Sequence, residues 1–402
     1  MADGKGTGVG AARRLIEDGE RRRRVGVRHR LASGAREPSV EDVAEALVAL
    51  HATDAATVFL AVGARLQDSR GTVAAVERAL YEERTLARMH GMRHTLFVFP
   101  VGIAPVVQAS TTHAVAVRER AVFLKHLAAA GGFDAHWLEQ TERETLSALA
   151  ARGEATAVQL GSDVPRLREK LVYEAGTARE VTQSVSTRLL RTLGTEGRVM
   201  RGRPLGSWTS SQFRWAIAPP MPELPAADAQ SELVRHWLAT CGPATEADLK
   251  WWTGWKVTDV RKALAAIGAE AVGLEDGTTG FVLAGDTEEA PEPEPWAALL
   301  PALDPTAMGW QQRDWFLDPD HRAELFDRSG NIGPTVWWNG RVIGGWAQRA
   351  ADGEIVWHLF APQGREVLDA IEAEAGRLAS WLGGARITPR FRTPLERRLT
   401  QL

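Results

Sequence analysis

The chain has 402 residues, a formal net charge of −3 and a sequence pI near 6.4. Hydrophobic residues make up 44% of it and charged residues 25%, which is typical of a globular protein with several domains. No apolar run reaches the roughly 18 residues of a membrane span, and the N-terminus lacks the apolar core of a signal peptide. We therefore expect a cytoplasmic protein with no membrane partner. The single cysteine, Cys241, excludes an internal disulfide and any cysteine-based metal cluster.

Arginine dominates the basic residues, since only six of the 48 are lysines. The planar guanidinium group suits phosphate, although a GC-rich coding sequence would produce the same excess. Because the net charge is negative, any nucleic acid would have to be bound by local basic patches. One candidate is a basic N-terminal arm over residues 1–30, which would follow a phosphate backbone or simply form a solvated face.

Residues 31–103 follow the plan of a winged helix. Apolar residues recur at helical spacing through three predicted helices, and two short strands follow that turn at Gly91. The two strands would form the wing. Its basic residues Arg88, Arg93 and His94 are candidate contacts to DNA.

The corner between the first two helices of this unit carries His51, Thr53 and Asp54. In a purely structural interpretation His51 would interact with the C-terminal dipole of one helix, and Thr53 or Asp54 would cap the next. In a chemical interpretation an imidazole with a pKa near 6.5 could accept a proton from water at neutral pH. Spacing alone leaves both interpretations open.

Residues 104–218 are predicted to hold a helical connector and a second winged helix. We expect helices near 164–173 and 181–193, and then a strand near 197–204. Basic residues interleaved with tryptophan suit a surface that contacts a nucleic-acid backbone, whereas a tryptophan-filled core seam would give the same pattern. The candidate DNA contacts here are Arg198, Arg201, Arg203, Trp208 and Arg214.

A third winged helix is predicted over residues 228–286, after a proline-rich linker. Thr245 caps a helix that ends at Gly254, and another helix begins three residues later, which is typical of a helix-turn-helix. Two strands around an Asp-Gly turn complete the unit. Arg261 and Lys262 on its second helix are candidate DNA contacts.

The last predicted domain covers residues 296–402. Strands around an Asn-Gly turn at 339–340 predict a small barrel or half-barrel, on which a helix at 365–382 would pack before a basic tail. The sequence thus predicts an α+β fold with three tandem winged helix-turn-helix units followed by a C-terminal β-barrel-like domain.

This order resembles the AlkZ/YcaQ-like DNA glycosylases, a family of proteins with winged-helix DNA-binding domains. The resemblance runs from about residue 25 to the end. The stretches that carry it are Leu-His-Ala-Thr-Asp from Leu50, Met-Arg-His-Thr-Leu from Met92, Gly-Arg-Val-Met-Arg-Gly from Gly197, Gly-Pro-Ala-Thr-Glu-Ala-Asp-Leu from Gly242, Leu-Leu-Pro-Ala-Leu-Asp from Leu299, and Gly-Asn-Ile-Gly-Pro-Thr from Gly330.

The resemblance implies a catalytic signature, Gln-x-Gln before an Asp, at the corner described above. Here His51 and Thr53 replace the two glutamines, while Asp54 is kept. The family removes bulky or cationic alkylated purines, so the implied activity is hydrolysis of the N-glycosidic bond of N7-alkylguanine, with water activated by these three residues.

The resemblance further implies a monofunctional enzyme that binds double-stranded DNA, without metal or cofactor. We expect it to act as a monomer associated with the nucleoid. The alternative is a non-catalytic winged-helix regulator that has lost the glutamines and reads bases with the third unit.

Overall fold

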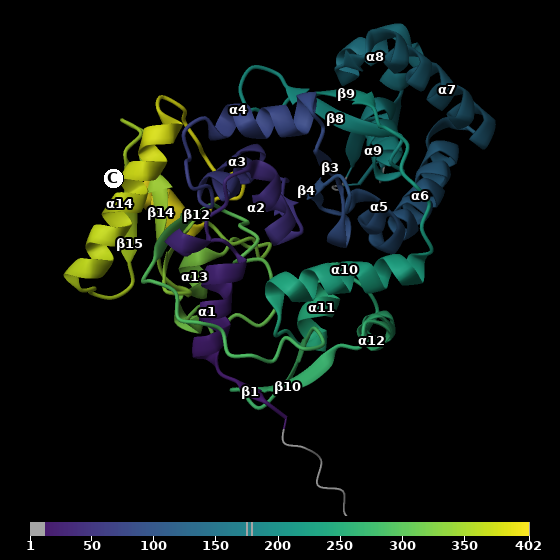
Figure 1. The fold of residues 1–402 in the computed structure, drawn as a ribbon. Helices are drawn as coiled ribbons and strands as arrows, with labels where there is room; N and C mark the ends of the chain where they lie inside the picture. Colours follow the sequence, from purple (N-terminus) through teal and green to yellow (C-terminus); the bar gives the residue numbers. More distant parts are fainter. Residues whose placement is uncertain (1–12, 174–175, 178–179, 402) are drawn as a thin grey trace, which may run out of the picture.

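The computed structural model describes residues 13–401, apart from 174–175 and 178–179. Helices and strands are mixed along the chain, as predicted. Figure 1 shows the C-terminal sheet and α14 at one end of the molecule, the elements of residues 113–217 at the other, and α2, α3 and α4 between them. The first twelve residues of the predicted basic arm lie outside the described part. Within the described ranges, no helix is both long enough and apolar enough to cross a membrane.

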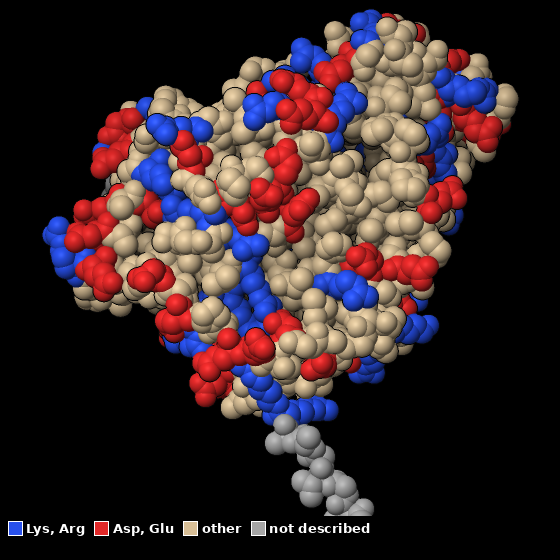
Figure 2. Space-filling view, viewed as in Figure 1, with Lys and Arg blue, Asp and Glu red and all other residues tan. Residues whose placement is uncertain are grey.

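The described part of the predicted arm is a packed helix, α1 (Asp18–Arg28). Arg24 is only 3% exposed and donates to Glu20 and to Asp286, each at 3.0 Å. Arg28 reaches the same Asp286 at 2.6 Å. Because these guanidinium groups already have carboxylate partners, the prediction of a free arm along a phosphate backbone is wrong for this helix. On the face of the molecule drawn in Figure 2, basic and acidic side chains are likewise interspersed.

The first unit has the element order helix, strand, helix, helix, strand, strand. Its three strands form an antiparallel sheet in the order β2-β4-β3. The apolar positions predicted at helical spacing are buried in it. Its elements are α2 (Val40–Leu47), β2 (Leu50–His51), α3 (Ala55–Gly63), α4 (Thr72–Glu77) with a π-turn to Glu82, β3 (Leu86–His90) and β4 (Leu96–Pro100).

A helical connector leads from β4 to the second unit. It consists of α5 (Ala104–Val107), a π-turn over Gln108–Thr112, α6 (His113–Gly131) and α7 (Ala135–Arg152). The second unit then adds β5 (Glu154–Ala155), α8 (Ala157–Asp163), β6 (Lys170–Tyr173), β7 (Val181–Ser184), α9 (Val185–Thr195), β8 (Val199–Pro204) and β9 (Phe213–Ile217).

Two predicted helices of this unit are partly strands. Residues 170–173 and 181–184 pair as an antiparallel hairpin, and α9 begins only at Val185. Leu171 is fully buried between exposed or half-buried neighbours, which is the alternation of a strand. The sequence was ambiguous there because a short segment rich in β-branched residues fits either period.

The third unit packs α10 (Ala226–Cys241), α11 (Glu246–Thr253) and α12 (Val257–Ala266) beside β10 (Glu270–Leu274) and β11 (Thr279–Val282). Thr245 forms the predicted capping box and Gly254 ends α11 at a φ of 77°. The short N-terminal strand β1 (Leu15–Ile16) pairs in parallel with β10. That the three units are winged helices stays a prediction.

Of the predicted barrel or half-barrel, the closed form is absent from the described residues, where no sheet closes, and the barrel-like domain is not confirmed. Four strands form an open antiparallel sheet in the order β12-β13-β14-β15, without a pairing between the two edges. Helix α14 packs against β12 instead. The elements are β12 (Ala297–Leu300), α13 (Arg322–Leu325), β13 (Thr335–Trp338), β14 (Arg341–Gln348), β15 (Ile355–Leu359), α14 (Arg365–Leu382) and α15 (Pro394–Leu399).

The C-terminal sheet shares its core with the first unit. Phe59 of α3 and Trp346 of β14 belong to one buried apolar cluster. Beside it, Arg65 and Asp304 form an ion pair in which both side chains are fully buried, with Nη2 to Oδ1 at 2.7 Å and Nη1 to Oδ2 at 2.9 Å. This junction sets the position of the segment that follows α14 relative to the corner before α3.

Candidate functional site

The segment 50–54 crosses from the first helix of the unit to the second as a short strand. Strand β2 pairs with β4, so that Leu50 faces Val98 and His51 faces Phe97. Asp54 then begins α3, because its Oδ1 accepts the N–H of Ala56 at 3.0 Å. The predicted N-cap is therefore present at Asp54. The predicted helix end at His51 is wrong, since α2 stops at Leu47.

A cavity of about 550 Å³ opens beside this segment. Its walls come from the first unit, the second unit and the segment after α14, and none of its lining residues belongs to the third unit. The lining residues are Ala52, Thr53, Asp54, Ala55, Arg88, Arg201, Pro204, Thr209, Ser210, Ser211, Phe213, Thr388 and Arg390.

Two of the three predicted catalytic residues, Thr53 and Asp54, face this cavity. The hydroxyl oxygen of Thr53 is buried and has no hydrogen-bond partner in the described structure. Asp54 is 8% exposed, and its Oδ2 accepts the backbone N–H of Arg390 at 2.7 Å. The carboxylate is thus held on both sides by backbone donors, and one face of it borders the cavity.

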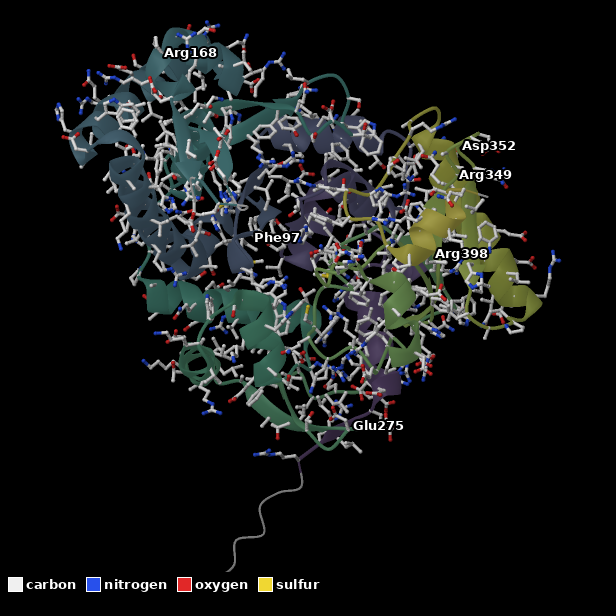
Figure 3. The ribbon with its side chains drawn as sticks, turned by 180° about the vertical axis from the view of Figure 1, so that it is seen from behind. Phe97, Arg168, Glu275, Arg349, Asp352 and Arg398 are labelled. Atoms are coloured by element: carbon white, nitrogen blue, oxygen red, sulfur yellow. The ribbon has the colours of Figure 1, made fainter. Side chains whose placement is uncertain are left out.

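His51 faces away from this cavity. Its ring packs edge-to-face on Phe97 with the centroids 4.9 Å apart, and it lines a separate space of about 20 Å³, which has room for about one water molecule. Figure 3 labels Phe97 near the centre of the molecule. Burial, and then the positive charge of Arg93, lower the pKa of His51 to about 3. His51 is therefore a neutral core residue here, which does not fit the predicted contact with a reacting water.

Arg88 and Arg201 are the predicted DNA contacts that line the cavity. They lie on β3 and β8, strands of different units. The guanidinium of Arg201 lies 4.0 Å from the ring centroid of Phe213. Burial, followed by repulsion from Arg88 and Arg390, lowers the pKa of Arg201 to about 10, so it still carries its charge at neutral pH.

The other two arginines predicted on the second wing are bound to carboxylates. Arg198 donates to Glu142 at 2.7 Å. Arg203 donates to Glu77 at 2.7 Å and to Glu82 at 2.8 Å. Their charges are therefore balanced inside the protein, which corrects the prediction that Arg198, Arg201 and Arg203 form one phosphate-binding set.

The turn between β3 and β4, which is the tip of the predicted first wing, is docked onto the rest of the protein. Arg93 lies 4.1 Å from the ring centroid of Trp251 on α11. His94 accepts or shares hydrogen bonds with Arg191 at 3.1 Å and Thr195 at 3.3 Å. Both residues contact other units and neither lines the cavity, so their contact with DNA stays a prediction.

The remaining predicted DNA contacts also lie outside the cavity lining. Trp208 is 9% exposed and packs on Phe59 at 4.9 Å, which is the core seam weighed above. Arg214 is half-buried on β9, next in sequence to the cavity residue Phe213 and so on the opposite face of the strand. Arg261 pairs with Glu246 at 3.0 Å, and Lys262 is exposed on α12.

Sequence reasoning missed Arg390, Thr388 and Phe213. The basic tail was recognised, but only the buried junction between the C-terminal sheet and the first unit brings residue 390 to Asp54. Among residues 13–401 as described, no cluster of three or more His, Cys, Asp or Glu side chains is arranged to hold a metal ion.

Comparison with known proteins identifies relatives in one family. The solved structure of Streptomyces sahachiroi DNA glycosylase AlkZ superposes with a TM-score of 0.67 over 92% of this chain and 98% of that one, at 21% identity, which shows a common fold. A curated interstrand DNA cross-link repair glycosylase from Streptomyces sahachiroi is 30% identical over 171 residues, 41% of this chain. The match spans about half the length of that relative, 46%. The family model described as DNA glycosylase AlkZ-like matches residues 44–381, so the chain belongs to the AlkZ-like DNA glycosylase family.

Proposed function

We propose that the protein is a monofunctional DNA glycosylase that hydrolyses the N-glycosidic bond of N7-alkylated guanine in duplex DNA. Family membership supports the enzyme class, and the observation that carries the site is the cavity beside Asp54. Thr53 and Asp54 occupy the corner where the family resemblance implies the catalytic signature. We further propose that the three units are winged helices and that the monomer acts near the nucleoid.

The reaction needs little more than an oriented water and a stabilised sugar cation. Alkylation at N7 gives guanine a positive charge, so the C1′–N9 bond breaks with neutral base leaving and an oxocarbenium-like sugar forms. The carboxylate of Asp54 would stabilise that positive charge. The unpaired hydroxyl of Thr53, once turned from its buried position into the cavity, would orient the water that attacks C1′, whose proton passes to Asp54 or to solvent.

His51 then has a positioning role in place of the predicted role as base. With a pKa of about 3 the ring is unprotonated, as a base must be. It is however only 5% exposed and lines a different space from the cavity beside Asp54. A base must lie within hydrogen-bonding reach of the water, directly or through one further water. By packing on Phe97, His51 holds β2 against β4 and so fixes the backbone that leads to Thr53 and Asp54.

Bulky adducts are included in the proposed substrate class. The curated relative is named for repair of interstrand cross-links, which are bulky lesions. A second cavity of about 200 Å³ shares Arg88 and Arg201 with the first and is otherwise largely apolar. It offers room for the apolar part of an adduct beside the proposed reaction site. Its apolar lining includes Leu86, Met89, Val199, Met221 and Pro222.

The test compares wild type with Asp54→Asn on duplex DNA that carries a single N7-methylguanine. Asparagine keeps an oxygen for the cap on Ala56 but removes the charge and the acceptor for the Arg390 N–H, so we expect single-turnover base release to fall by about 10² to 10³, with a thermal melt to check the fold. Ser39→Ala is the matched control, because Ser39 caps α2 through Asp42 and lies away from the cavity. It should lose about 1 kcal/mol of stability and keep base release.

The second candidate is a DNA-binding protein without catalysis, which the exchange of both glutamines favours. Under that alternative, folded wild type would bind duplex DNA and release no base from N7-methylguanine or from a bulkier N7 adduct. Equal base release by wild type and Asp54→Asn would instead show that an enzyme is present but uses another residue.

A further inference from the structure

Three arginines in the cavity have no carboxylate or hydrogen-bond partner for their side chains among the described residues. Arg88 comes from β3, Arg201 from β8 and Arg390 from the segment after α14. Over the described ranges, none of the three side chains forms an ion pair or donates a hydrogen bond, and the buried Nε atoms of Arg88 and Arg201 are left without acceptors. Unpaired Nε atoms occur at other arginines as well, but here three arginines without an acceptor line one cavity, and that combination suits a site completed by a ligand.

The required ligand is an anion that offers several acceptor oxygens. The only carboxylate in the cavity lining is Asp54, and its oxygens already accept backbone N–H groups from Ala56 and Arg390. All three arginines line this one cavity, from three different segments of the chain, so a single ligand there can meet all three charges. The guanidinium fork matches the free oxygens of a phosphate better than any single point charge does.

We propose that Arg88, Arg201 and Arg390 together bind one phosphate of the DNA backbone, next to the nucleotide whose base is removed. The proposal rests on the proposed function and identifies the group that anchors its substrate. It also assigns a role to the C-terminal segment Thr388–Arg390, because that segment supplies the third arginine and completes the cavity wall.

The same segment connects phosphate binding to the reacting centre. The side chain of Arg390 faces the cavity, whereas its backbone N–H donates to Oδ2 of Asp54 at 2.7 Å. A phosphate that holds the side chain therefore also holds the backbone that orients the carboxylate. Arg390 is in this sense a positioning residue for Asp54 as well as a binding residue.

The test replaces single phosphates by uncharged methylphosphonates in duplexes that carry a tetrahydrofuran analogue of the abasic product. For wild type, one position beside the analogue should weaken binding by about ten-fold or more, as expected for loss of a charged hydrogen-bonded group. Arg390→Ala should lose affinity with the all-phosphate duplex but show no further loss when that same position is neutralised. Because alanine keeps the backbone N–H to Asp54, the variant should fold as wild type, which a thermal melt checks.

Arg328→Ala is the matched control, since Arg328 is an exposed arginine of the same C-terminal region outside the cavity lining. It should keep the wild-type methylphosphonate profile. Arg390→Lys should recover part of the affinity and part of the single-turnover rate at saturating DNA, because it restores charge without the fork. A wild-type profile in Arg390→Ala, with the same sensitive position, would overturn the proposal.

The outcome is separable from that of the proposed function. Binding to the product analogue requires no turnover, so coupling between Arg390 and one phosphate can be measured even if no base is released. Base release with no such coupling would overturn the phosphate site alone. Coupling with no base release would overturn the glycosylase proposal alone and leave the anion site in a DNA-binding protein.

Discussion

Two regions of the molecule bury arginine in opposite ways. At the junction between the first unit and the C-terminal sheet, all five N–H groups of Arg65 donate hydrogen bonds. Nε donates to the carbonyl oxygen of His29 at 2.8 Å. Nη1 donates to the carbonyl oxygen of Ala61 and to Asp304, and Nη2 donates to Asp304 and to Thr306. In the cavity, Nε of Arg201 has no acceptor within the described structure. The same side chain therefore stabilises the fold where its donors are satisfied, and is available to a ligand where they are not.

The largest effect should come from removing one partner of the satisfied pair. Arg65→Met leaves Asp304 buried without its counter-charge, so we expect a loss of about 3–5 kcal/mol in the free energy of unfolding. Arg201→Met should leave stability unchanged or raise it slightly, while the slope of log affinity for DNA against log salt falls by about 0.9. Chemical denaturation and a salt titration of DNA binding measure the two quantities. Similar stability losses in both variants would remove the distinction between the regions.

A pair of threonines extends the comparison to neutral groups. Thr57 in α3 donates its hydroxyl to Ala302 O at 3.0 Å, whereas the hydroxyl of Thr53 has no partner among the described residues. Thr57→Val should lower the free energy of unfolding by about 1–3 kcal/mol, because the buried carbonyl of Ala302 loses its donor. The variant should release base at the wild-type rate. Thr53→Val should change stability by less than about 0.5 kcal/mol and slow base release. A stable, fully active Thr53→Val variant would show that this hydroxyl does not orient water.

The effect that is smallest near neutral pH, and that grows only on acidification, is the share of one histidine in stability. Burial lowers the pKa of His29, His51 and His90 to about 3, well below the ordinary value of 6.5. Between pH 6.5 and 3 the unfolded chain binds protons that the folded chain does not, so stability is full above pH 6.5 and falls on acidification. Each histidine contributes at most about 1.4 kcal/mol per pH unit in that window.

His51→Gln should reduce this acid dependence by the share of one histidine, as measured by urea unfolding at several pH values. Base release by wild type should show no acid limb near pH 6.5 arising from His51, because the folded protein keeps that ring neutral. An acid limb near pH 6.5 that disappears in His51→Gln would restore the prediction that His51 is the base.

The amino-acid sequence by itself determined the family and most of the secondary structure. Helical spacing of apolar residues predicted α2, α3 and α14, and Thr245 and Gly254 marked the ends of α11, because caps and stops act within a few residues. The stretches that resemble AlkZ/YcaQ-like glycosylases were sufficient for membership, which the comparisons confirm. The mixed α+β class is likewise confirmed, while a closed barrel did not form in the described residues; local turn signals do not say whether the edges of a sheet meet.

Tertiary structure alone decided which polar residues are satisfied inside the protein and which face the cavity. Arg198, Arg201 and Arg203 are alike in sequence, yet only Arg201 lacks a carboxylate, because the partners of the other two come from α7, α4 and the π-turn that follows α4. His51 and Asp54 lie three residues apart, yet the pairing of β2 with β4 turns the histidine into the core. Arg390 reaches Asp54 across 336 positions of the chain. Such long-range contacts depend on how whole elements pack, and that information is absent from any short stretch of sequence.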